Sequence, residues 1–190
     1  MRRKGTILLL AAVVLLSVAG IVWGADEVTD PDKRMKLYEK QEEMRKNSQF
    51  RNLDWQFIGP TNVSGRMTDV AVVAPKGENY TMYVAAASGG VWKTVNEGHT
   101  WKPVFEHAAS TSIGDVTLAP SNQEIVWVGT GEANIFRSSM AGSGVYKSVN
   151  GGDTWQHMGL AGTLTIPRIV IHPQNPDIVY VAASGHEWTD

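Results

Sequence analysis

The chain contains the stretch Thr94-Val95-Asn96-Glu97-Gly98-His99-Thr100-Trp101 and, 54 residues later, the stretch Ser148-Val149-Asn150-Gly151-Gly152-Asp153-Thr154-Trp155. Both follow the form Ser/Thr-x-Asn-x-Gly-x-Thr-Trp, and we call them the first and the second octad. The asparagine can bind turn amides, the glycine can adopt a positive φ, the hydroxyls can tie the turn and the tryptophan can cover it. The pattern therefore predicts two tight turns, whose structural residues are Asn96, Gly98, Thr100, Trp101, Asn150, Gly152, Thr154 and Trp155.

The sequence around the octads repeats as well. From Trp55 onward, short β-branched runs alternate with Gly, Asn, Ser and Pro, which is typical of many short strands. Matching runs occupy 69–72, 83–85 and 90–93, then 115–118, 127–129 and 144–147, and finally 168–171 and 180–182. A period near 50 residues made of four short strands predicts the blades of a β-propeller.

The predicted fold class is therefore all-β, with blades of four antiparallel strands filling residues 51–190. We place the blades at about 55–106, 107–160 and 161–190, two of them complete and the third truncated. Closing a propeller usually takes about four to eight blades. We therefore expect this chain to be the N-terminal part of a longer protein, the alternative being that its open edges pair with a partner.

The N-terminus carries a targeting signal. Arg2, Arg3 and Lys4 precede an uncharged apolar run at 7–22, which predicts a secretory signal peptide over 1–24. That run is shorter than the roughly 20 residues of a membrane span, so cleavage is favoured over an uncleaved anchor, and no stable span is expected afterwards. Residues 25–50 have closely mixed charges and predict a solvated helical spacer.

Composition excludes several kinds of function. Without cysteine the chain has no disulfide, thiolate metal site or cysteine nucleophile, and export without cysteine favours a bacterial protein that is periplasmic, at the cell surface or secreted. A net charge of -2 gives no field for nucleic acid. The five histidines fit no zinc spacing and the glycines fit no phosphate loop, so neither a metal nor a cofactor is predicted.

The octads resemble the Asp-box of bacterial neuraminidase-type (BNR) repeats, with Asn96 and Asn150 where that family prefers aspartate. The phrases at 59–66, 87–93 and 171–180 resemble exported bacterial propellers described as sortilin-like or as glycosyl hydrolases. The resemblance implies a β-propeller that binds a protein, peptide or glycan. It also implies two alternatives, a glycoside hydrolase and an assembly factor for an envelope complex.

The candidate ligand-binding residues lie on the loops opposite the octads. The stretch between Val128 and Val145 is ten residues longer than its counterpart in the first copy and contains Glu132, Asn134 and Arg137. A mobile loop with these side chains predicts a binding loop, the alternative being a variable loop or a plug in the channel.

Two arginines belong to the same predicted rim. Arg66 and Arg168 lie near the starts of first strands. In neuraminidase-like enzymes an arginine cluster binds a carboxylate, because a guanidinium group can donate two parallel hydrogen bonds to it. The alternative is that these arginines tie neighbouring blade loops together.

No catalytic set is assignable. A glycoside hydrolase needs two carboxylates across a cleft. Xyloglucanase-type propellers, which this chain resembles, place a catalytic aspartate before a Gly-Gly strand entry, where this chain has Ala87 and Ala141. Asp69 and Asp115 recur at one repeat position, which favours a scaffold role. If the protein is a hydrolase, its acid and base are expected beyond residue 190.

Overall fold

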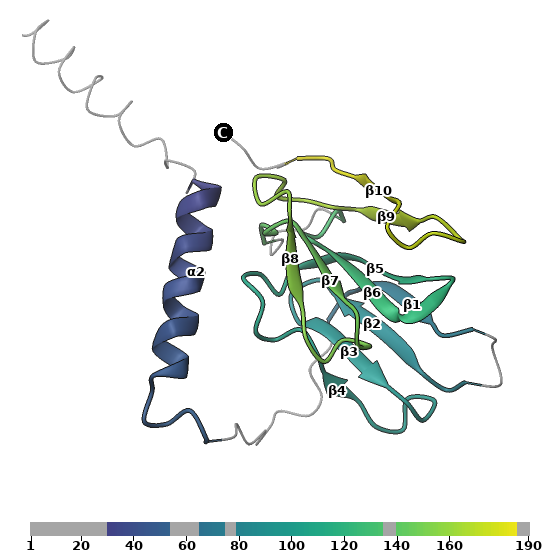
Figure 1. Cartoon of the computed structure of the whole chain (residues 1–190), viewed down its shortest axis with the longest axis horizontal. Helices are drawn as coiled ribbons and strands as arrows, with labels where there is room; N and C mark the ends of the chain where they lie inside the picture. The colour runs from purple at the N-terminus through teal and green to yellow at the C-terminus, as the bar shows by residue number, and fades with distance from the viewer. Residues whose placement is uncertain (1–29, 54–64, 75–78, 135–139, 186–190) are drawn as a thin grey trace, which may run out of the picture. The chain divides into compact units, whose positions relative to one another are not determined.

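A computed structural model describes residues 30–53, 65–74, 79–134 and 140–185 (Figure 1). The predicted signal peptide at 1–24 and the candidate Arg137 lie outside the described residues. The described residues all belong to one compact unit. In the part of the chain that the structure describes, no helix has both the length and the hydrophobicity that crossing a membrane requires.

The described strands form three antiparallel sheets in which each strand pairs with its neighbour in sequence (Figure 1). The first sheet has the order β1 (Met67–Val72), β2 (Met82–Ala86), β3 (Gly90–Thr94) and β4 (Lys102–Pro103). The second has the order β5 (Ile113–Ala119), β6 (Asn122–Thr130), β7 (Val145–Ser148) and β8 (Gln156–Gly159). The third pairs β9 (Arg168–Ile171) with β10 (Val179–Ala182). The predicted all-β class with four-stranded antiparallel sheets is confirmed.

The second sheet repeats the register of the first. Asp69 pairs with Ala85 across β1 and β2, and Asp115 pairs with Gly129 across β5 and β6. A register shift precedes the aspartate in both pairs, between Met67 and Asp69 and between Ile113 and Asp115. A bulge at a fixed place re-aims the side chain that follows it, so the two aspartates occupy equivalent positions.

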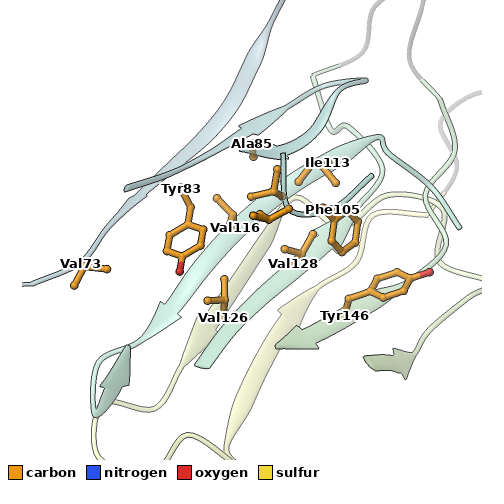
Figure 2. Packing of buried hydrophobic residues seen from close by; sticks show 11 residues of the cluster. Val73, Tyr83, Ala85, Phe105, Ile113, Val116, Val126, Val128 and Tyr146 are labelled. Carbon is orange, nitrogen blue, oxygen red and sulfur yellow. The ribbon is translucent and has the colours of Figure 1, made fainter. Parts of the chain in front are cut away.

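A hydrophobic core fills the space between the first two sheets (Figure 2). Alternate side chains of a strand point to opposite faces, so β2 contributes Tyr83 and Ala85, while β6 contributes Val126 and Val128. Phe105, on the segment that links the sheets, joins this core. Full burial of one such side chain stabilises the fold by about 1.5–3 kcal/mol, so this interface holds the two sheets together.

The opposite face of the second sheet forms a second core with the third. Trp127 and Val145 pack there with Ile166, Ile169 and Ile171. Gly129 allows the close approach, because a Cβ at that position would lie 2.5 Å from Ile166 Cγ2. The second sheet is therefore covered on both faces.

The two octads adopt the same turn. In the first, Gly98 N donates to Thr94 Oγ1 at 2.9 Å and Thr100 N donates to Asn96 Oδ1 at 2.9 Å. The second has the equivalent bonds, from Gly152 N to Ser148 Oγ at 2.8 Å and from Thr154 N to Asn150 Oδ1 at 2.9 Å. In both, the asparagine Nδ2 donates to the threonine Oγ1 at 2.9 Å.

Helix α2 (Pro31–Lys46) lies within the predicted spacer. Asp30 caps its N-terminus by accepting from Asp32 N, and Arg45 and Lys46 lie in its last turn. None of its residues is buried, as a solvated spacer requires. The helix is nevertheless attached to the rest of the unit, which the sequence did not indicate. Its bonds run from Arg34 to the carbonyls of Gly142 (3.0 Å) and Ala161 (3.2 Å) and from Tyr38 Oη to the carbonyl of His107 (2.6 Å).

Candidate functional site

The structure brings two of the candidate rim residues together. Arg66 Nε donates to Glu132 Oε1 at 2.7 Å, and Arg66 Nη2 donates to Glu132 Oε2 at 2.6 Å. The Glu132 side chain is 0% exposed, and its backbone N–H donates to Ser112 Oγ at 3.1 Å. The hydrogen bond to Glu132 raises the pKa of Arg66 above its ordinary value.

This pair joins the first sheet to the second. Arg66 precedes β1, whereas Glu132 follows β6. The bidentate geometry is the strong form of an arginine–carboxylate contact. The Glu132 carboxylate is engaged by Arg66, while the Arg66 side chain keeps 37% of its surface exposed. A ligand arriving from solvent would therefore meet the guanidinium before the carboxylate.

The repeated aspartates each reach across to the next sheet. Asp69 Oδ2 accepts from Val116 N at 3.3 Å, and Asp115 Oδ2 accepts from Ile169 N at 3.0 Å. Arg168, the third candidate arginine, pairs with Asp115 Oδ1 at 3.3 Å. The structure thus places Arg168 in a contact between the second and third sheets, apart from the Arg66–Glu132 pair.

The carboxyl group of Asp115 has a raised pKa. Burial, at 1% exposure, and the nearby Asp69 together raise this pKa to about 6, against the opposing effects of the Ile169 N–H and Arg168. A raised pKa is what a general acid requires. However, Asp115 is covered and bonded to the backbone of the next sheet, so it joins sheets and cannot meet a substrate.

The remaining candidates lie on the long loop. Asn134 is exposed, and Arg137 lies outside the described residues. The far end of the loop is anchored, because Gly142 N donates to the Leu164 carbonyl at 2.7 Å and Ser143 N donates to Thr130 Oγ1 at 2.7 Å. Across the described ranges, no three side chains of His, Cys, Asp or Glu gather closely enough to hold a metal ion.

A pocket that the sequence did not predict lies between helix α2 and the first two sheets. It has a volume of about 340 Å³, and we call it the α2 pocket. Its walls come from α2, from residues 102–108 after the first octad, from β7 and from the end of the second octad. Its aromatic lining residues are Tyr38, Phe105, Tyr146 and Trp155, and its carboxylates belong to Glu42, Glu106 and Asp153.

The aromatic rings of the α2 pocket are held in place. Phe105 stands edge-on to Tyr146 and to Trp155, with ring centroids 5.2 and 4.9 Å apart. Trp155 Nε1 donates to the Val104 carbonyl at 2.6 Å. Burial raises the pKa of Tyr38 and of Tyr146, so both phenols stay neutral near pH 7. The pocket thus has a rigid apolar wall.

The charged side chains lie at the more exposed edge of the pocket. Glu106 is 48% exposed, and Asp153 is exposed as well. Glu42 pairs with Arg45 at 2.7 Å, and the lining also includes Lys102 and His107. An apolar wall with polar groups at its edge suits a ligand that has both characters. The sequence offered one signal for this site, the end of the second octad with Trp155, because the other lining residues are scattered from 38 to 146.

Comparison with solved structures identifies the fold. The chain is similar to an ancestral GH74 enzyme with a TM-score of 0.50 and 21% identity over 64% of this chain. It is also similar to the GH74 enzyme of Niastella koreensis, with a TM-score of 0.43 and 20% identity over 55% of this chain. The chain spans 14% and 15% of the lengths of these two proteins. GH74 enzymes are β-propeller-like glycoside hydrolases. No family model and no curated protein matches the sequence.

Proposed function

We propose that this chain is part of a β-propeller binding module that recognises a protein, peptide or glycan. The α2 pocket is the observation that carries the proposal. Its volume of about 340 Å³ falls in the range of roughly 300–1,000 Å³ that is usual for ligand sites. Its ordered rings provide contact area at a low cost in conformational entropy, because little freedom is left to lose on binding.

The predicted rim contributes less to this proposal. Glu132 is engaged by Arg66, and Asp115 by Ile169 and Arg168. The exposed parts of Arg66, Arg168 and Asn134 remain candidates for secondary contacts with a large ligand. Three points remain predictions from the sequence: the resemblance to Asp-box repeats, the resemblance to sortilin-like propellers, and export through a signal peptide.

The binding proposal is tested by replacing one wall of the pocket. Tyr38→Ala removes a ring that lines the α2 pocket together with the hydroxyl that donates to the His107 carbonyl, and the core is left intact because no residue of α2 is buried. Tyr38→Phe removes that hydrogen bond alone and separates the two effects. We expect a glycan or peptide ligand found by array screening to bind the variant about tenfold more weakly, since the lost ring contact is worth about 1–2 kcal/mol. Titration calorimetry measures the affinity.

The matched control is Leu37→Ala, the neighbouring position on the same helix. Leu37 is exposed and does not line the pocket, so its variant should bind like the parent chain. Equal losses in both variants would show that the helix as a whole matters and not the pocket. Unchanged binding by Tyr38→Ala would place the ligand elsewhere and contradict the proposal.

The alternative function is glycoside hydrolysis, which the fold likeness to GH74 enzymes favours. Asp69 and Asp115, the acidic residues at the repeated position, are committed to contacts between sheets. A hydrolase would thus need carboxylates other than these two. Release of reducing ends from β-glucans by the protein, lost when a carboxylate elsewhere is replaced, would support this alternative.

A further inference from the structure

We propose that the α2 pocket binds a basic side chain, lysine or arginine, of a peptide ligand. The inference rests on the proposed function, since it assumes that this pocket is the ligand site. It names the class of ligand, which that function leaves open among proteins, peptides and glycans.

The charge of the pocket edge is the first argument. Three carboxylates line the pocket, against one lysine and one histidine. Glu42 is paired with Arg45, and Glu106 lies 4.0 Å from His107, which is charged only when protonated. Among the described residues the carboxylate of Asp153 forms no ion pair within 4.0 Å. Glu106 and Asp153 are therefore available to an incoming cation.

The aromatic wall is the second argument. A cation is attracted to the face of an aromatic ring, and tryptophan is the strongest such partner. Trp155 lines the pocket with its indole N–H already bonded to Val104, which fixes the ring. The chain uses this contact at two equivalent places, because Lys93 Nζ lies 5.4 Å from the centre of the Tyr83 ring and Lys147 Nζ lies 5.3 Å from that of Trp127.

The two arguments together favour a basic peptide over the other ligands. A neutral glycan could stack on Trp155 but would leave the charges of Glu106 and Asp153 unmatched. An acidic peptide would be repelled by both. A lysine or arginine side chain offers an aliphatic stem for the rings of the pocket and a charged head for the carboxylates.

The test measures fluorescence anisotropy of three labelled peptides with the whole chain. The peptides are Gly-Lys-Gly-Lys-Gly and two versions with norleucine or glutamate in place of lysine. We expect the lysine peptide to bind at least about tenfold more tightly than the norleucine peptide. We also expect its affinity to fall as salt rises from 0.05 to 0.5 M, because ions screen exposed charges.

The variant Glu106→Gln/Asp153→Asn should bind the lysine peptide about tenfold more weakly than the parent does. Glu39→Gln/Glu43→Gln removes the same charge from exposed helix positions that do not line the pocket, and it should bind like the parent. Glu106 lies outside the octad, so the single variant Glu106→Gln still tests the inference if Asp153→Asn disturbs the turn. Circular dichroism checks that each variant folds.

The outcomes separate the inference from the proposed function. Equal binding of the lysine and norleucine peptides, or full binding by the carboxylate variants, overturns the basic-peptide inference. If a neutral glycan binds and depends on Tyr38 while no peptide does, the binding function stands and the inference fails. If no peptide or glycan binding depends on Tyr38, both fail.

Discussion

The two octads have the same internal hydrogen bonds but differ in their contacts with the rest of the protein. Their internal hydrogen bonds match in partners and nearly in length. The second octad, however, packs on the first sheet, where Tyr83 Oη and Lys93 Nζ donate to the Gly151 carbonyl at 2.9 and 2.8 Å. At the matching place the first octad has Glu97, whose side chain is exposed. The repeated pattern thus encodes the turn, and the neighbouring sheet decides how much the turn stabilises the fold.

The tryptophans provide the largest test of this comparison. Trp155 contacts Phe105 and donates to the Val104 carbonyl, whereas Trp101 is 40% exposed. We expect Trp155→Ala to lower the free energy of unfolding by about 3 kcal/mol and Trp101→Ala by about 1 kcal/mol. Urea unfolding followed by circular dichroism measures both. Equal losses would mean that the neighbouring sheet adds nothing.

Asp115, which joins the second sheet to the third, is expected to make the stability depend on pH. The pKa of Asp115 is raised to about 6, above its ordinary value of 3.8, so the folded state holds this proton more tightly than the unfolded chain does. The stabilisation that results is complete below about pH 4 and is lost as the pH rises through about 6. Between pH 4 and pH 7 the parent should lose about 2 kcal/mol relative to Asp115→Asn.

This difference is obtained by measuring the free energy of unfolding of the parent and of Asp115→Asn at pH 4 and at pH 7. Glu39→Gln, an exposed helix change, is the control and should show no such difference. A parent and an Asp115→Asn variant with parallel pH profiles would contradict the raised pKa.

The turn glycines are expected to differ less. Gly98 and Gly152 have φ values of 87° and 91°, so a side chain strains either backbone. A Cβ at Gly98 would lie 3.3 Å from Trp101 of its own turn, and a Cβ at Gly152 would be in ordinary van der Waals contact with Trp155, Val104 and Tyr83. The packed neighbours at Gly152 therefore add no clash. We expect Gly98→Ala and Gly152→Ala each to cost about 1 kcal/mol in thermal unfolding. A loss at Gly152 larger by more than about 1 kcal/mol would show that the neighbouring sheet adds to the strain.

The asparagines should not differ at all. Asn96 and Asn150 make the same bonds within their turns, so replacing either by alanine should cost about 1 kcal/mol. Chemical unfolding of the two variants side by side checks the equality. A gap of more than about 1 kcal/mol between them would show that the turn itself depends on its neighbours.

The sequence predicted the parts of the fold that depend on local pattern. The octads, the short strands and their repetition follow from turn chemistry and from β-branched runs that recur along the chain. The attachment of helix α2 was not predicted, because Arg34 bonds to carbonyls of Gly142 and Ala161, more than 100 residues away, and backbone acceptors leave no trace in a side-chain pattern.

The candidate site was predicted less completely. Arg66 and Glu132 were chosen separately for their residue types, and their pairing follows from how the first two sheets pack, a relation that neither loop encodes alone. The α2 pocket combines residues from four separate segments. Gly152, Thr154 and Trp155 drew attention beforehand, and they did so as parts of a turn.

The strand order has a consequence for how the chain forms. Within each described sheet, every strand after the first pairs with the one before it, so each ladder closes within a short stretch of chain and the loop-closure entropy of each step is small. A sheet can be complete as soon as its own residues leave the ribosome. It then provides the surface against which the next octad packs. Assembly in this order, from the N-terminus onward, would keep unpaired strand edges few at every stage of synthesis.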